Sequence, residues 1–271
     1  MVQVLIVGGN SLVSKEIALL ELSKDCKVFC IINKNSSRVP KSCAIISLES
    51  AMNMSFERVY LIAANIPYGN FNEVTEDLVK SNIDLPRVIS EKFPSSKLIY
   101  SSSVAVFGNQ INISDESQLT PTDAYGVSKA VAETIVKRHA KYAILRLPSI
   151  YGEEINDKGF VPRILRQARE GEIMIFGSGE RTQNYVHYKT AGELLVAIGS
   201  DEKSQIFNCI LEKSISNISL AKALKKIKPS IEITYQGEDF TSSSNFEVVN
   251  PSNYYNLFTF EPLISYIQNN L

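Results

Sequence analysis

Residues 1–20 read MVQVLIVGGNSLVSKEIALL, and this stretch decides the fold. The apolar, β-branched run at residues 2–7 predicts a buried strand, and two glycines follow it directly. Apolar residues then recur with the spacing of one helix face between residues 12 and 20. A strand, a glycine turn and a helix in this order present main-chain N–H groups at a helix N-terminus, where a pyrophosphate can bind.

Apolar runs with strand character recur along the chain, separated by stretches with helical spacing. The expected strands are residues 28–32, 44–46, 59–64, 97–100 and 142–146, and the expected helices are residues 72–92 and 124–140. Strands that alternate with helices form a parallel sheet that is covered on both faces. The sequence therefore predicts an α/β fold, a doubly wound parallel sheet of the Rossmann type with a smaller C-terminal lobe.

The length and composition agree with this fold. A chain of 271 residues, 44% of them hydrophobic, can form a large α/β domain and a smaller appended one. The formal net charge of −1 provides no electrostatic attraction for nucleic acid or an anionic membrane surface. No apolar stretch is long enough to span a bilayer, and the first strand leaves no room for a signal peptide. We therefore expect a cytoplasmic protein that binds neither nucleic acid nor membrane.

The cysteines form no recognisable motif. They lack the spacing of a zinc site or of a redox pair, and they stand at Cys26, Cys30, Cys43 and Cys209. Each lies in or beside an apolar run, so we expect buried free thiols and no metal site.

The segment Tyr125-Gly-Val-Ser-Lys129 carries groups that are suited to proton transfer. On a helix over residues 124–140, Tyr125 and Lys129 stand at positions i and i+4 of one face. A phenol in isolation has a pKa of about 10, and a nearby ammonium lowers that pKa toward the working range. Ser103 follows a predicted strand, so its hydroxyl can hold a substrate oxygen beside the phenol. The three groups suit hydride transfer at a carbinol or ketone, although a Tyr and a Lys four residues apart are common on helix surfaces.

Further motifs stand at ordered separations around this segment. They are YSSSVAVFG at 100–108, Asp115-Glu116, Pro121, Glu133, LRLPSIYG at 145–152 and GSGERTQNYVH at 177–187. With these motifs the chain resembles the extended short-chain dehydrogenase/reductase superfamily, and within it the NAD-dependent epimerase/dehydratase family of nucleotide-sugar enzymes. The resemblance covers roughly residues 2–215. It implies that Ser103, Tyr125 and Lys129 are the catalytic residues and that a nucleotide sugar is the substrate.

The cofactor loop departs from this family. The family pattern is G-x-x-G-x-x-G, whereas residues 8–14 read GGNSLVS, so Ser11 and Ser14 replace two glycines. We still expect this loop to hold a dinucleotide pyrophosphate, through Gly8, Asn10, Ser11, Leu12 and Val13. The alternative is a loop that no longer binds a dinucleotide.

The acidic residue that usually binds the adenosine ribose is also missing after the second strand. Asn33 can hydrogen-bond a hydroxyl there, while Lys34 and Arg38 can pair with a 2′-phosphate. This modestly favours NADP over NAD, although the two cations are equally consistent with a solvated loop.

The resemblance implies roles for other residues one position at a time. The expected additional cofactor contacts are Ala63, Ala64, Asn82, Ser101, Tyr125, Lys129 and Pro148. For Asn82 the resemblance offers an alternative role, which is to order its helix against the active site. The expected substrate contacts are Ser103, Val104, Phe160 and Arg181, with Val161 and Arg163 on the same side. A guanidinium fork matches phosphate geometry, so Arg181 is the candidate for the nucleotide diphosphate, with a surface salt bridge as the alternative. Gln183 and Lys189-Thr190 depart from the family pattern.

We expect two domains, with residues 1–149 binding the dinucleotide and residues 150–271 forming mainly a substrate lobe. Residues 182–199 are expected to return to the first domain and to end in a helix.

The helices at 72–92 and 124–140 could pair with a second subunit, as in relatives, to form a homodimer. His139 lies in a charged helix end and is expected to be solvated, whereas His187 is expected to be structural.

Three classes of function remain open. Dehydratases of this family carry an Asp-Glu pair after the active-site Ser or Thr, but Ser103 is followed by Val104-Ala105, which disfavours water elimination. An epimerase must retain its cofactor through each cycle, and the altered loop indicates weaker retention. The sequence therefore favours reduction of a 4-keto sugar nucleotide, with a nucleotide-sugar 4-epimerase as the alternative. The remaining alternative is a non-catalytic dinucleotide-binding sensor or scaffold.

Overall fold

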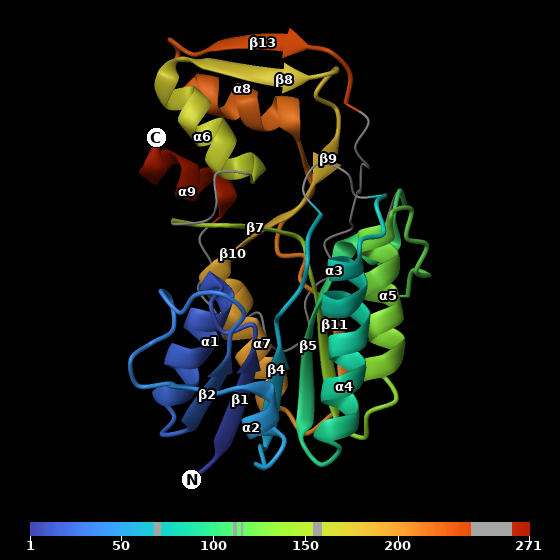
Figure 1. Ribbon diagram of the computed structural model, residues 1–271. Coiled ribbons are helices and arrows are strands. Elements are labelled where there is room, and N and C mark those ends of the chain that lie inside the picture. Colours follow the sequence, from blue (N-terminus) through green and yellow to red (C-terminus); the bar gives the residue numbers. More distant parts are fainter. Residues whose placement is uncertain (68–71, 111–112, 115, 154–158, 240–261) are drawn as a thin grey trace. The chain divides into compact units, whose positions relative to one another are not determined.

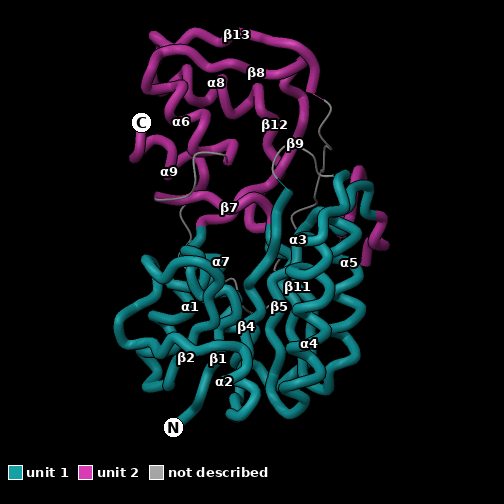
Figure 2. The backbone as a smooth tube through the Cα atoms, in the orientation of Figure 1, with its two compact units in different colours: residues 1–106, 121–147, 188–209 teal, residues 107–120, 148–187, 210–271 magenta. Residues whose placement is uncertain are grey.

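The computed structural model describes residues 1–67, 72–110, 113–114, 116–153, 159–239 and 262–271. The chain forms two compact units, which Figure 2 colours separately. Unit 1 contains residues 1–106, 121–147 and 188–209, and unit 2 contains residues 107–120, 148–187 and 210–271. The expected boundaries therefore need correction. The returning segment is 188–209 rather than 182–199, because it consists of a helix from Tyr188 and a strand that joins the large sheet.

Unit 1 is built on a seven-stranded sheet with the order β11-β6-β5-β4-β1-β2-β3. Its strands are β1 (Gln3–Val7), β2 (Lys27–Ile31), β3 (Ala44–Ile45), β4 (Arg58–Leu61), β5 (Lys97–Ser103), β6 (Tyr142–Leu147) and β11 (Gln205–Asn208). Every neighbouring pair is parallel. This confirms the predicted Rossmann-type fold. The near-continuous burial of β1, β4 and β6 explains why these strands read as unbroken apolar runs.

Helices cover both faces of this sheet, as Figure 1 shows. They are α1 (Leu12–Leu22), α2 (Leu48–Ala51), α3 (Glu76–Val79), α4 (Leu85–Lys92), α5 (Ala124–Val136) and α7 (Tyr188–Ser200). Helix α1 packs against α7, and α4 packs against α5. The single helix expected at 72–92 is instead interrupted by a π-helical turn at Lys80–Asp84, and the helix expected to reach residue 140 ends at Val136.

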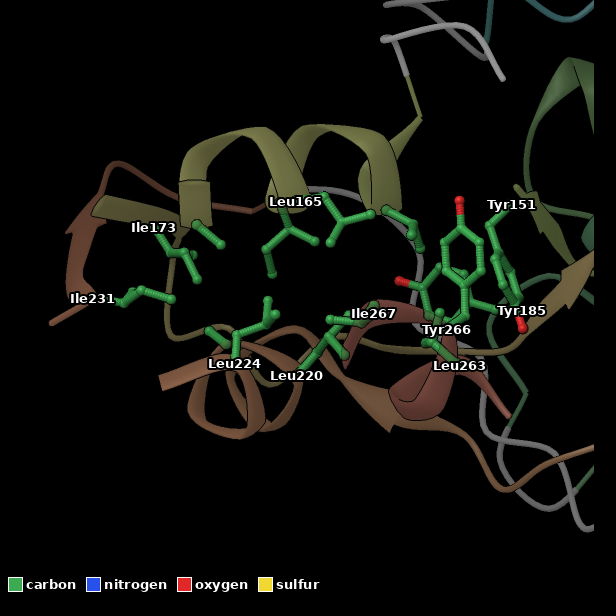
Figure 3. Close-up of a cluster of buried hydrophobic side chains, with 14 of the residues drawn as sticks. Tyr151, Leu165, Ile173, Tyr185, Leu220, Leu224, Ile231, Leu263, Tyr266 and Ile267 are labelled. Atoms are coloured by element: carbon green, nitrogen blue, oxygen red, sulfur yellow. The ribbon is translucent and has the colours of Figure 1, made fainter. Parts of the chain in front are cut away.

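Unit 2 has its own hydrophobic core between three helices and a parallel strand pair. The helices are α6 (Phe160–Glu170), α8 (Asn217–Ile227) and α9 (Leu263–Asn270), and the pair is β8 (Glu172–Phe176) with β13 (Glu232–Gln236). Figure 3 shows Leu165, Leu220 and Ile267 facing one another in this core. Two more strand pairs complete the unit: β7 (Ser149–Tyr151) with β10 (Tyr185–His187), and β9 (Thr182–Gln183) with β12 (Ile215–Ser216).

Two expectations about single residues were wrong. His139 is buried rather than solvated. Its Nδ1 lies 2.9 Å from the carbonyl oxygen of Lys141 and its Nε2 lies 3.0 Å from that of Phe93, so main-chain carbonyls take the place of water around the ring. Cys43 is only partly buried, whereas the other three cysteines are buried free thiols as expected.

Two classes of feature are missing from the part of the chain that the structure describes. No helix there is long and apolar enough to cross a membrane. The same residues contain no group of His, Cys, Asp or Glu side chains that could hold a metal ion.

Candidate active site

The glycine turn after β1 fits too tightly between its neighbours to accept a side chain. Gly8 has a φ of +93°, and a Cβ atom placed on it would lie 2.5 Å from the main-chain nitrogen of Ala63. A Cβ on Gly9 would lie 2.7 Å from the Cβ of Cys30. The N–H groups of Gly8 and Gly9 both donate to the carbonyl oxygen of Ile31, at 2.9 Å. The turn is thus anchored to β2 and passes directly over the segment after β4.

The two serines that replace family glycines tie the start of α1 to this turn. Ser11 is the N-cap, and its Oγ accepts a hydrogen bond of 2.9 Å from the N–H of Ser14. Ser14 is fully buried, and its hydroxyl donates to the carbonyl oxygen of Gly8 at 2.8 Å. The N–H groups of a first helical turn have no acceptor within the helix, so those of Leu12 and Val13 suit a phosphate. The residues present therefore fit a dinucleotide pyrophosphate.

Asn10 connects this turn to the loop after β2. Its Oδ1 accepts the N–H of Arg38 at 2.9 Å, and its Nδ2 donates to the side-chain oxygen of Asn35. Asn33 and Lys34 are exposed in the same loop, and Arg38 is half-buried. Sequence reasoning missed Asn35, because only the folded loop brings it to Asn10.

The first turn of α5 carries Tyr125 and is held closely against the loop after β5. Asp123 caps the helix by accepting the N–H of Gly126 at 2.7 Å. A Cβ on Gly126 would lie 2.5 Å from the carbonyl oxygen of Ala105, so only glycine allows this approach. Tyr125 is 8% exposed.

Lys129 lies one turn further along α5, and its ammonium is buried against the end of β5. Its Nζ donates to the carbonyl oxygen of Ser101 at 2.7 Å and lies 4.4 Å from the centroid of the Tyr100 ring. Burial lowers the pKa of Lys129 to about 7, and the nearby carboxylate of Glu133 opposes that decrease. Lys129 therefore changes its charge state near neutral pH.

Ser103 ends β5 in the same unit. Its Oγ accepts the N–H of Ala105 at 3.2 Å, which leaves the hydroxyl hydrogen available for a substrate oxygen. Helix α5 packs against β5, so the structure brings the three predicted catalytic residues onto two adjoining elements. Val104 follows directly in a 3₁₀ turn at Val104–Phe107.

A buried ion pair lies one helical turn beyond Lys129. The guanidinium of Arg146 donates to both carboxylate oxygens of Glu133 at 2.9 Å, and Ser102 donates to the same carboxylate at 2.7 Å. Glu133 was noted in the sequence only as part of a motif. In the structure it joins α5 to β5 and β6 beneath the site.

The other expected cofactor residues lie at several places in the chain. Ala63 and Ala64 follow β4, and the N–H of Ala63 donates to the carbonyl oxygen of Val7 at 2.9 Å. Asn82 is buried in the π turn and hydrogen-bonds protein groups. Pro148 is buried at the start of the second chain segment of unit 2.

The expected substrate residues of the second half cluster within unit 2. The guanidinium of Arg163 lies 5.3 Å from the ring centroid of Phe160 and 5.5 Å from that of Phe176. The Phe160 ring stacks on Tyr185 with 6.4 Å between centroids. Burial lowers the pKa of Arg163, and the charges of Arg181 and Arg166 lower it further, whereas Asp239 raises it. Within the described ranges the Nε of Arg163 has no hydrogen-bond acceptor. An arginine beside two aromatic rings, within the electrostatic reach of a second arginine, suits an anionic ligand with a planar base.

Comparison with known proteins gives a family match for most of the chain. A sequence model of the "NAD dependent epimerase/dehydratase family" matches residues 4–209. A protein of Methanocaldococcus jannaschii named as a putative UDP-glucose 4-epimerase is 29% identical over 163 residues, which cover 54% of this chain and 50% of that protein. The chain thus spans about half the length of this curated relative.

Solved structures share the fold over nearly the whole chain. A UDP-N-acetylglucosamine 4-epimerase from Methanobrevibacter ruminantium superposes with a TM-score of 0.82 at 19% identity, covering 98% of this chain and 97% of that one. An NAD-dependent NDP-hexosamine 5,6-dehydratase involved in tunicamycin biosynthesis superposes with a TM-score of 0.84 at 17% identity, covering 100% and 96%. At these identities the likeness describes the fold alone.

Proposed function

Because this chain belongs to the NAD-dependent epimerase/dehydratase family, we propose that it reduces a nucleotide-linked 4-keto sugar by hydride transfer. The observation that carries the proposal is the buried ammonium of Lys129 at the carbonyl of Ser101, one helical turn from Tyr125 and beside the strand that ends at Ser103. A surface Tyr–Lys pair would have neither this burial nor this acceptor. The arrangement supports an enzyme over a non-catalytic sensor or scaffold.

In the proposed reaction the bound dinucleotide supplies the hydride. Tyr125 gives its phenolic proton to the carbonyl oxygen of the sugar as that oxygen becomes a hydroxyl, and solvent later restores the proton. Lys129, when protonated, would stabilise the phenolate and would hold the ribose of a bound cofactor. Ser103 donates its hydroxyl hydrogen to the same sugar oxygen and orients it toward Tyr125.

For the cofactor we propose NADP. The segment from residue 32 to residue 43 contains Lys34, Arg38 and Lys41 and no carboxylate, so nothing in its sequence repels a 2′-phosphate. Asn10 and Asn35 add amide groups beside Arg38. NAD, which the dehydratase of similar fold uses according to its name, is the alternative.

For the substrate we propose a nucleotide diphosphate linked to the sugar. The arginines 163 and 181 would bind the diphosphate, and the ring of Phe160 would contact the nucleotide or the sugar. A nucleotide-sugar 4-epimerase is the second candidate, because the curated relative from Methanocaldococcus jannaschii carries that name.

We also propose that the protein forms a homodimer through α4 and α5. Val127 and Val131 stand one turn apart on α5 and are 46% and 39% exposed. A second copy would remove these apolar side chains from water. Light scattering of the purified protein would measure the mass directly.

Titration with NADPH and NADH, followed by nicotinamide fluorescence, tests the cofactor. Saturable binding with tighter NADPH is expected, and no binding of either dinucleotide would reject the enzyme proposal. Incubation with a nucleotide-linked 4-keto sugar then separates the two reactions. A reductase consumes one NADPH for each product molecule, whereas an epimerase interconverts the C4 epimers of a nucleotide sugar with no net consumption.

A further inference from the structure

Two cysteines that are distant in the sequence lie side by side at the edge of the large sheet. Cys30 is in β2, and Cys43 directly precedes β3, which is the last strand of the sheet. These two strands pair in parallel, with Cys30 opposite Ile45. The side chains of the two cysteines form a hydrogen bond with each other. The sequence spacing did not reveal this pair, because only the pairing of β2 with β3 brings the two thiols together.

The two thiols differ in exposure and in acidity. Cys30 is 0% exposed, whereas Cys43 is partly exposed. The hydrogen bond with Cys43 raises the pKa of Cys30, and burial raises it further. The same hydrogen bond lowers the pKa of Cys43, although burial opposes the decrease. A thiol that solvent reaches and whose thiolate is stabilised is the one that an oxidant attacks first. Cys43 therefore has the character of the reacting thiol, and Cys30 is its neighbour.

Cys30 also touches the glycine turn that fits a dinucleotide pyrophosphate. A Cβ atom on Gly9 would lie 3.1 Å from the Sγ of Cys30, so this sulfur lies directly against the turn. The loop between the two cysteines contains Arg38, whose N–H donates to the Oδ1 of Asn10 at 2.9 Å. Asn10 follows Gly9 in the same turn. The pair thus lies at the base of a loop that contacts the turn at two points.

We propose that Cys30 and Cys43 form a redox-active dithiol, which a peroxide converts to a disulfide that weakens dinucleotide binding. The disulfide brings the two sulfurs closer together than their hydrogen bond does. Because the sulfur of Cys30 lies against Gly9, this movement disturbs the packing beneath the turn. Displacing donors that are preorganised for a ligand lowers the affinity for that ligand. The effect on binding rests on the proposed function, since it takes the turn as the cofactor site.

The oxidation takes two steps. The thiolate of Cys43 attacks one oxygen of hydrogen peroxide, the O–O bond breaks, and the other oxygen takes up a proton and leaves as water. Cys43 is then a sulfenic acid. The sulfur of Cys30 attacks the sulfur of Cys43, the S–O bond breaks, and the hydroxyl leaves with the thiol proton of Cys30 as a second water. The two sulfurs have lost two electrons in total, and the peroxide has gained them.

Mass spectrometry of the full chain tests the disulfide. The protein is treated with hydrogen peroxide, the remaining thiols are alkylated, and the peptides are mapped. We expect a peptide that links Cys30 to Cys43, with Cys26 and Cys209 alkylated, and we expect dithiothreitol to restore the parental map. A sulfinic acid on Cys43 without a linked peptide, a link between other cysteines, or no oxidation would overturn the proposal.

Titration with NADPH before and after oxidation tests the effect on the turn. We expect the Kd to rise by at least about tenfold in the disulfide form and to return to the parental value after reduction. An unchanged Kd in protein that is shown to contain the disulfide would overturn the effect on binding.

Two variants serve as matched controls. Cys43→Ser removes the reacting thiol with little change in volume, so it should bind NADPH like the reduced parent and should not respond to peroxide. Cys209→Ala removes a buried thiol of the same unit that lies after β11, so it should respond as the parent does. A peroxide response of parental size in Cys43→Ser, or its loss in Cys209→Ala, would refute the assignment of the pair.

Failure of the proposed function has a different result. If the reduced parent binds neither NADPH nor NADH, the proposed function and the effect on binding both fail. The linked peptide still decides in that case whether Cys30 and Cys43 are a redox-active dithiol.

Discussion

The Nζ atom of Lys129 lies 2.7 Å from the carbonyl oxygen of Ser101, and the side chain of Lys129 is 1% exposed. A main-chain carbonyl offers a buried ammonium only part of the solvation that water would provide. The pKa of Lys129 is therefore close to neutral pH, where the side chain releases its proton. A bound dinucleotide, with its ribose hydroxyls and phosphates, would favour the charged form.

This relationship predicts that dinucleotide affinity depends on the charge of Lys129. Burial lowers the pKa of Lys129 to about 7, so the free protein loses this charge as the pH rises through 7. Binding an anionic ligand then requires proton uptake, and the affinity should fall above pH 7 and level off below it. Fluorescence titrations between pH 6 and pH 9 would measure this. The dependence should be absent in Lys129→Met, and an unchanged slope in that variant would contradict the assignment.

Tyr125→Phe removes the phenolic proton and little volume. We expect the dinucleotide Kd to stay near the parental value, because the phenylalanine ring keeps almost the whole volume of the side chain. Turnover of a nucleotide-linked 4-keto sugar should fall by roughly two to four powers of ten if general acid catalysis is the main loss. Steady-state kinetics with NADPH absorbance would decide this. A variant as fast as the parent would remove Tyr125 from the mechanism.

Gly8→Ala should abolish dinucleotide binding. The added methyl group would lie 2.5 Å from the nitrogen of Ala63, and the φ of +93° is strained for alanine. Gly171→Ala is the matched control, since Gly171 has a φ of +95° but no atom within 4 Å of a built Cβ. The control variant should lose only about 1–2 kcal/mol of stability from backbone strain and bind normally. Equal binding by both variants would show that the close approach at Gly8 is unimportant.

The buried Glu21 should control the acid stability of unit 1. Arg58 donates to both of its carboxylate oxygens, at 3.0 and 2.7 Å, and Tyr60 donates at 2.5 Å. Burial by itself raises the pKa of Glu21, but these hydrogen bonds outweigh it and leave the pKa below its ordinary value of 4.5. The stability that this carboxylate provides is therefore fully present above pH 4.5 and is lost as the pH falls through the lowered pKa.

The variant Glu21→Gln tests this role of Glu21 in acid stability, because it leaves Arg58 without its charge partner. The loss in the free energy of unfolding at pH 7 should be about 3–5 kcal/mol, and the variant should lose less additional stability in acid than the parent does. Urea unfolding at several pH values would measure both effects. Glu91→Gln removes an exposed pair with Arg87 and should change stability by less than about 1 kcal/mol. Similar losses in the two variants would contradict the prediction.

The sequence by itself determined the strand–glycine–helix start, the parallel α/β sheet and the placement of Tyr125 and Lys129 on one helix. These features follow from local periodicity and from residues whose backbone preferences are strong, so a short window of sequence is enough to read them.

The tertiary structure alone decided which distant groups share a hydrogen bond. The amide of Asn82 reaches Ser128, 46 residues later, and His139 is buried because Phe93 offers it a carbonyl from another segment. The shift of Lys129 to a pKa of about 7 likewise depends on the surroundings that β5 and α5 create together. Such partners are selected by burial, since a polar group removed from water must find a donor or acceptor in whatever segment packs against it.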